Sequence, residues 1–95
     1  MIIGTLRVSL RLEGCRSLKD KRQILRSLLD KSRRQFHVAI AEVGEHDLWQ
    51  NAVIGVSSVS TDAGHAESVL QHVVDLFDAC PDVAVEEAAK EIERR

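Results

Sequence analysis

Residues 17–34 read SLKDKRQILRSLLDKSRR, a run in which leucines and cations recur at the spacing of an α-helix. Projected at about 100° per residue, the apolar side chains gather on one face. They are Leu18, Ile24, Leu25, Leu28 and Leu29. Ser17 is a natural N-cap, because its hydroxyl can accept a hydrogen bond from an unpaired N–H of the first turn. The run therefore predicts an amphipathic helix that begins at Ser17 and ends near Gln35.

The other side of this helix carries positive charge. A stripe about 60° wide, named the basic stripe below, holds four cations. They are Lys19, Arg22, Arg26 and Arg33. Asp20 and Asp30 are expected at the margins of the stripe, so no acid should interrupt it. Such a row can follow the phosphates of a polyanion, and the alternative is that these cations are only solvated.

The rest of the chain predicts three or four strands and a second helix. Residues 2–13 alternate apolar and polar side chains, as a strand with one buried face does. Further strands are predicted at residues 36–43 and 51–61, and a helix capped by Asp62 at residues 63–79. Residues 83–93 are ambiguous, because their start favours a strand and the run EEAAKE favours a helix.

This order is typical of one architecture. A βαββαβ chain of this length predicts an α+β ferredoxin-like sandwich, with a four-stranded antiparallel sheet and two helices on one face. The topology favours a strand for the ambiguous last segment, because without it the first strand would be an open edge. Ninety-five residues are enough for a single domain, which would span residues 1–95.

Charge is divided unevenly along the chain. The net charge is only −2, but residues 1–36 hold ten Lys/Arg and three Asp/Glu, whereas residues 37–95 hold three Lys/Arg and twelve Asp/Glu. This asymmetry indicates one side that faces a polyanion and one acidic side. The alternative is that the opposite charges meet within the fold or across a dimer.

Several functional classes find no support in the sequence. Cys15 and Cys80 form neither a CxxC pair nor a zinc-ligand spacing, and two free thiols fit the reducing cytosol. His65 and His72 would be about 10 Å apart along a helix, too far to share one metal ion. No P-loop, GxGxxG or Ser-His-Asp pattern is present. We therefore expect no catalytic residue, metal, cofactor or small-molecule substrate. With no signal peptide or membrane span either, we expect a cytoplasmic protein.

Three loops should meet at one end of the sandwich, beside the start of the first helix. They are residues 13–17, 44–50 and 79–82. The N-terminus of that helix attracts anions, and Trp49 and His46 can flank it and stack on a base. In the alternative reading, Trp49 covers the end of the core. The predicted nucleic-acid site consists of Arg16, Lys19, Arg22, Arg26, Arg33 and Trp49.

The outer face of the sheet predicts a second kind of contact. Its central strands carry no aromatic residue, so bases are not expected to stack there as they do on RNA-recognition motifs. Val53 and Val59 fall on this face instead. They indicate a sheet-to-sheet homodimer.

Four short strings carry a resemblance that spans nearly the whole chain. They are SLKDKR at 17–22, FHVA at 36–39, AEV at 41–43 and DLWQ at 47–50, followed by Ile54-Gly55. The chain resembles the YlxP-like family, small bacterial proteins of unassigned function. The resemblance implies a ferredoxin-like fold, and a gene often found beside translation-initiation and ribosome-maturation genes. It brings no catalytic residues.

Together these observations predict an accessory protein without enzymatic activity that binds RNA or a ribosomal particle through its basic helix. The alternative is a homo-oligomeric module that binds a protein partner and has no role with nucleic acid. In that case the basic residues 1–36 and the acidic residues 37–95 complement each other.

Overall fold

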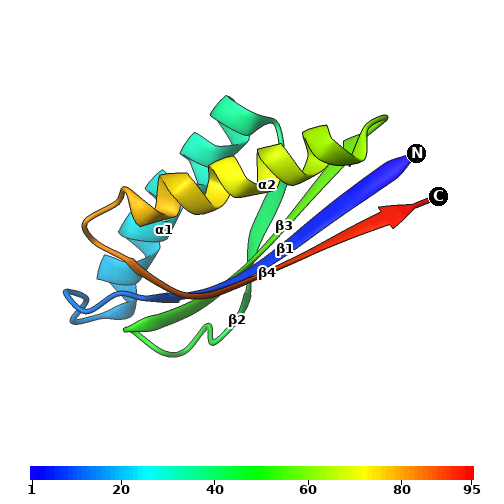
Figure 1. The fold of residues 1–95 in the computed structure, drawn as a ribbon. Coiled ribbons are helices and arrows are strands. Elements are labelled where there is room, and N and C mark those ends of the chain that lie inside the picture. The colour runs from blue at the N-terminus through cyan, green and yellow to red at the C-terminus, as the bar shows by residue number, and fades with distance from the viewer.

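The computed structural model describes residues 1–95 and contains six elements in the predicted order. They are β1 (Ile2–Arg11), α1 (Leu18–Phe36), β2 (Ala39–Gly44), β3 (Asn51–Ser60), α2 (Ala63–Asp78) and β4 (Ala84–Arg94). The strands form one sheet in the order β2-β3-β1-β4, and all neighbours are antiparallel. Both helices cover the same face of this sheet (Figure 1). The predicted ferredoxin-like sandwich is confirmed.

The ambiguous last segment is a strand. β4 pairs with β1 along its length, from Ile2 opposite Arg94 to Arg11 opposite Ala84, with one register shift near Ser9. Backbone pairing with β1 therefore outweighs the helical propensity of residues 86–91. As a result β1 lies in the middle of the sheet, and β2 and β4 form its edges.

The α1 helix begins where predicted but ends later. The Ser17 hydroxyl accepts a hydrogen bond from the Asp20 N–H at 3.1 Å. Phe36 is still helical, and the helix ends at His37, a left-handed residue with φ of 53° whose N–H donates to the Arg33 carbonyl. The strand predicted from residue 36 was therefore wrong in its first three residues, because β2 starts at Ala39.

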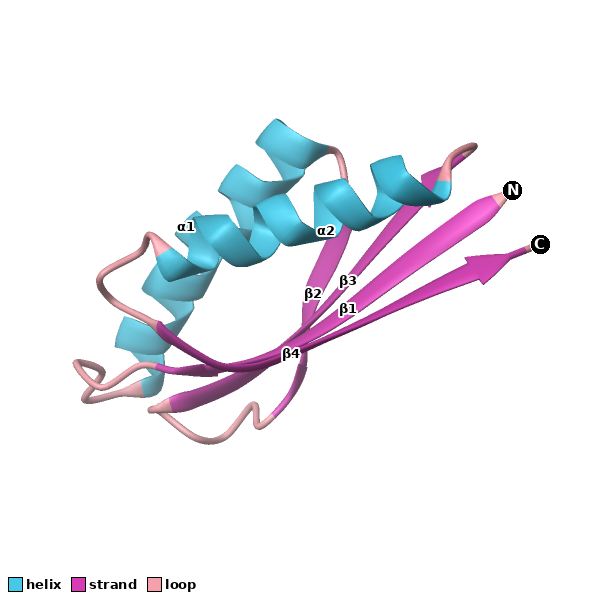
Figure 2. Cartoon of the chain, viewed as in Figure 1, coloured by secondary structure: helices cyan, strands magenta, loops and turns pink.

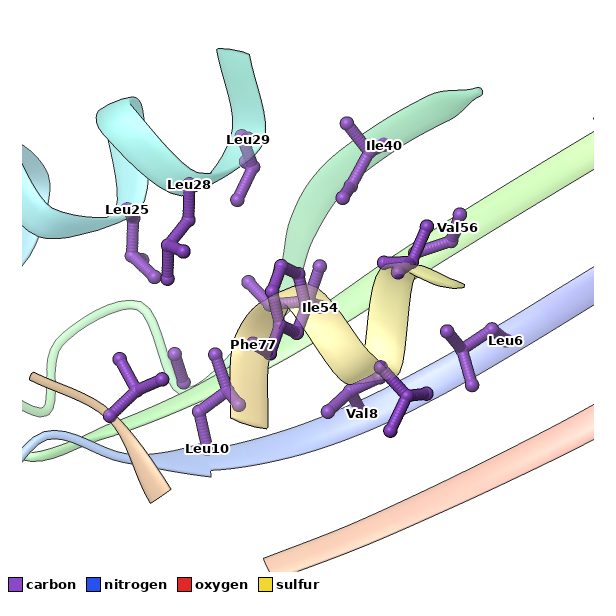
Figure 3. Close-up of a cluster of buried hydrophobic side chains, with 14 of the residues drawn as sticks. Leu6, Val8, Leu10, Leu25, Leu28, Leu29, Ile40, Ile54, Val56 and Phe77 are labelled. Carbon is purple, nitrogen blue, oxygen red and sulfur yellow. The ribbon is translucent and has the colours of Figure 1, made fainter. Parts of the chain in front are cut away.

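The core lies between the sheet and the helices. It is a cluster of 18 buried residues, and the side chains from α1, α2 and the strands converge there (Figure 3). Leu25, Leu28, Val56, Val73 and Phe77 all belong to it. On α1 the predicted apolar face is confirmed at Leu25, Leu28 and Leu29, whereas Leu18 and Ile24 remain partly exposed.

Candidate nucleic-acid interface

The basic stripe lies on the flank of α1 that faces the edge strand β2. Arg33 shows this, because its guanidinium donates a hydrogen bond of 2.8 Å to the Ile40 carbonyl in β2. The opposite flank of α1 carries Ile24, Ser27 and Lys31, which line a groove against α2. The stripe is therefore turned away from α2, toward one edge of the sheet.

Most of the predicted cations are free. Lys19, Arg22 and Arg26 are exposed and form no ion pair or side-chain hydrogen bond within the chain. Arg16, one residue before the helix cap, is exposed as well, and its guanidinium has no partner. Four positive charges are thus available at the N-terminal half of α1 and just before it.

Arg33 differs from the other members of the stripe. Its guanidinium lies 3.0 Å from the Asp30 carboxylate, in addition to its bond with β2. The prediction that no acid interrupts the stripe was wrong here, because residues three apart are neighbours on a helix surface. The free part of the stripe is therefore Lys19, Arg22 and Arg26.

The N-terminus of α1 is already occupied by an acid of its own. The Asp20 carboxylate accepts a hydrogen bond of 3.1 Å from the Arg16 N–H, while the Asp20 N–H donates to Ser17. This arrangement resembles a capping box, in which a residue of the first turn reaches back over the helix start. The helix terminus is thus less suited to an anion than predicted, so phosphates would depend on the side chains.

The three loops meet as predicted. The Leu12 N–H donates to the Gln50 carbonyl at 2.9 Å, which joins the first loop to the β2–β3 loop. Gly14 and Pro81 both line a hollow of about 240 Å³, so the first loop lies beside the α2–β4 loop. All three loops lie at the end of the sandwich away from the chain termini (Figure 2).

Lys21 is the residue of this region that the sequence reading missed. Its side chain is 2% exposed, and its ammonium donates hydrogen bonds of 2.8 Å each to the carbonyls of Glu45 and Leu48. The Glu42 carboxylate lies 2.7 Å from the same nitrogen, outside the angles of a hydrogen bond, so this third contact is a charge–charge interaction. Lys21 therefore ties α1 to β2 and to the β2–β3 loop.

A signal for Lys21 was present in the sequence. At about 100° per residue it falls about 200° from Lys19, on the leucine side of the helix. A cation on an apolar face predicts a buried partner. Lys21 lies in the string SLKDKR and Leu48 in the string DLWQ, so the contact joins two of the strings that carry the family resemblance.

Trp49 does not cover the core. Its side chain is 51% exposed, and its neighbour Leu48 is about half exposed. His46 lies on the same loop, and its ring Nε2 is 3.2 Å from the Glu42 carbonyl. Trp49 is thus half exposed, and it directly follows Leu48, whose carbonyl accepts a hydrogen bond from Lys21.

Comparison with protein families now identifies the chain. The family model described as a protein of unknown function, DUF503, matches residues 3–90. The chain belongs to this family. It is also 36% identical over 67 residues to the uncharacterized protein YlxP of Bacillus subtilis (strain 168), a match that covers 70% of this chain and 73% of that protein.

Solved structures resemble this member of the family in fold alone. A de novo designed protein with a ferredoxin fold superimposes with a TM-score of 0.60 at 8% identity, over 100% of this chain and 88% of the design. A REP-associated tyrosine transposase bound to a REP hairpin gives a TM-score of 0.53 at 16% identity, over 98% of this chain and 56% of the transposase. Both likenesses support the sandwich topology.

The basic residues 1–36 and the acidic residues 37–95 of this family member form few ion pairs with each other. Only two ion pairs join residues 1–36 to residues 37–95, namely Arg11–Glu86 and Lys21–Glu42. The alternative that the charges meet within the fold thus accounts for few of them. The remaining charges are left to solvent or to a partner.

The environment of Cys15 does not favour a reactive thiol. Burial raises the pKa of the Cys15 thiol, and the nearby carboxylates of Asp20 and Asp82 raise it further. A raised pKa keeps this thiol protonated and poorly nucleophilic.

Neither helix is long and apolar enough to cross a membrane.

Proposed function

We propose that this protein is a cytoplasmic binding factor without enzymatic activity, and that it binds RNA or a ribosomal particle through α1. The supporting observation is the set of four exposed cations without partners in the chain. They are Arg16, Lys19, Arg22 and Arg26. A cation with no internal partner can neutralise a phosphate and release its counterion, which favours binding to nucleic acid.

The placement of the acids favours the same orientation. Most Asp and Glu residues of the second half of the chain belong to α2, β4 and the segments beside them. The free stripe lies on the other flank of the molecule, beside β2, so a polyanion is attracted to α1 and repelled from β4. From Lys19 to Arg26 the free stripe covers about 10 Å of helix, whereas the full stripe from Lys19 to Arg33 covers about 20 Å.

Changing the three free cations of the stripe tests this proposal. The triple variant Lys19→Gln, Arg22→Gln, Arg26→Gln should bind bulk RNA and ribosomal particles more weakly. Its slope of log affinity against log salt should fall by about two to three, because each lost phosphate contact removes about one released counterion. Binding is measured at several salt concentrations, and circular dichroism checks the fold.

A matched control separates position from net charge. Arg7, Lys31 and Arg94 are also exposed and without ion pairs, but they lie outside the basic stripe. Changing these three to Gln removes the same charge and should leave the slope near that of the wild type. Equal losses in both triple variants, or none in the first, would contradict the proposal.

A homo-oligomer is the second candidate function, and one observation favours it. Val59 on the outer face of β3 is 69% exposed, and Val43 is also exposed and packs beside Gly55 on that face. Val53, predicted to belong to the exposed patch, is buried, and its register partners on the neighbouring strands are Ser9 of β1 and Gly44 of β2. The apolar patch is therefore smaller than expected but still unpartnered.

If this face pairs two copies, light scattering at high concentration should give the mass of a dimer. A two-fold arrangement is the commonest for such a contact. Val59→Glu should then return the protein to a monomer, because it would place charge in the buried contact. A monomeric mass for the wild type at all concentrations would rule out this candidate.

A further inference from the structure

The β2–β3 loop presents two large apolar side chains to solvent in a fixed position. Leu48 and Trp49 are about half exposed, yet the backbone beside them is held from within the fold. Lys21 binds the carbonyls of Glu45 and Leu48, and it is almost fully buried while doing so. A loop anchored in this way loses little further freedom when something binds to it.

The surface around Trp49 combines an aromatic ring with polar groups. Asp47, Leu48, Trp49, Gln50 and Asn51 line an open hollow of about 400 Å³. The amides of Gln50 and Asn51 can both donate and accept hydrogen bonds, and the Asp47 carboxylate accepts them. Proteins that read unpaired RNA bases use this combination, with a ring for stacking and polar groups for the base edge.

The hollow is linked through Lys21 to the helix that carries the free cations. The Lys21 ammonium and the Leu48 carbonyl are 2.8 Å apart. On α1 the residue after Lys21 is Arg22, a member of the free stripe, and on the loop the residue after Leu48 is Trp49. The Lys21 side chain therefore connects the part of α1 that carries Arg22 to the part of the loop that carries Trp49. The charge of the stripe favours a polyanion over an apolar protein surface as the occupant.

We infer that the hollow at Trp49 binds one unpaired base of a single-stranded RNA whose phosphates lie along Lys19, Arg22 and Arg26. The base stacks on the Trp49 ring, and Lys21 is the positioning residue that holds the ring beside the stripe. This inference rests on the proposed function and specifies its ligand. In a duplex the bases are stacked on one another, so they cannot reach Trp49.

The chain offers its own probe for this contact. Trp49 is the only tryptophan, and there is no tyrosine, so the intrinsic fluorescence reports on this loop. A short single-stranded RNA should quench the fluorescence as it binds. A duplex of the same sequence should bind more weakly and leave the fluorescence unchanged.

Trp49→Ala should lower the affinity for the single strand by about tenfold, because stacking is lost. It should leave the salt slope unchanged, since no cation is removed. Trp49→Phe should retain most of the affinity. The triple Gln variant is expected to show the opposite pattern, with a lower slope and quenching that persists at low salt.

Lys21→Met should give the same loss of affinity as Trp49→Ala, again at an unchanged salt slope. The decay of Trp49 fluorescence anisotropy separates positioning from general damage, because it should show a faster local motion while circular dichroism stays native. If Lys21→Met does not fold, the double variant with Glu42→Gln, which leaves no unpaired charge, is used in the same assay.

The outcomes separate this inference from the proposed function. If Trp49→Ala binds the single strand as the wild type does while the triple variant fails, the inference is wrong and the proposed function stands. If Trp49→Ala keeps its RNA affinity and wild-type Trp49 fluorescence instead shifts on self-association, the loop is a protein contact and the inference is wrong. If the wild type binds neither RNA nor ribosomal particles at low salt, the proposed function is wrong and the inference with it.

Discussion

Lys21→Met is expected to lower the free energy of unfolding by about 3–5 kcal/mol, the usual cost of removing one partner from a buried ion pair. Methionine keeps the unbranched shape of the side chain, one atom shorter, but cannot donate to the carbonyls of Glu45 and Leu48. The Glu42 side chain is 23% exposed, but the oxygen that contacts Lys21 is buried, so the change leaves that oxygen without a partner. We measure the loss by urea unfolding.

Lys19→Met is the matched control for this change. Lys19 lies two residues earlier on the same helix, is exposed and has no partner, so its replacement should alter the stability by less than about 0.5 kcal/mol. The double variant Lys21→Met, Glu42→Gln should be more stable than Lys21→Met alone, because it leaves no uncompensated charge. Equal midpoints for Lys19→Met and Lys21→Met would show that the buried ammonium contributes no stability.

Local patterns were enough to predict every element but the last. The leucines of α1, the caps at Ser17 and Asp62 and the alternation in β1 each act within a few residues, and their signals agree with one another. The last segment needed a longer argument, because its composition favours a helix and only pairing with β1 makes it a strand. Topology supplied what local propensity did not.

The details that the sequence did not predict depend on distant partners. The helix phase puts Lys21 on the leucine side, but its partners are carbonyls of a loop 24 to 27 residues further along the chain. Arg33 is occupied because β2 passes beside the last turns of α1. Val53 is buried, and the register between β2 and β3 shifts after Glu42, so that Gly44 lies opposite it. Counting charges or apolar residues by type cannot locate such contacts.

These differences also change the predicted site. Of its six residues, Arg16, Lys19, Arg22, Arg26 and Trp49 are exposed, and Arg33 is held by Asp30 and β2. The site therefore moves toward the N-terminal half of α1 and the β2–β3 loop. Both of these regions are fixed by Lys21, so the residue that was missed has a central place in the geometry.

Phe77→Ala is the second large effect that we expect, with a loss of about 3–5 kcal/mol in the free energy of unfolding. Phe77 is fully buried and lies between α2 and the strands, next to the labelled side chains of the core (Figure 3). Removing its ring leaves a cavity that the sheet beneath cannot close, because the strands are paired along their length. Urea unfolding measures the loss.

Phe77→Leu is the control, and we expect it to cost less than half as much, because leucine fills most of the same space. If the protein binds RNA as proposed, the folded fraction of Phe77→Ala should bind it with the salt slope of the wild type. Phe77 is a buried apolar residue, and its replacement removes no cation from the surface. A change in slope would mean that packing under α2 controls the placement of the stripe on α1. A decrease in the free energy of unfolding below about 1 kcal/mol would be too small for an aromatic ring in a closed core. It would show that α2 can rotate and fill the space left by the ring.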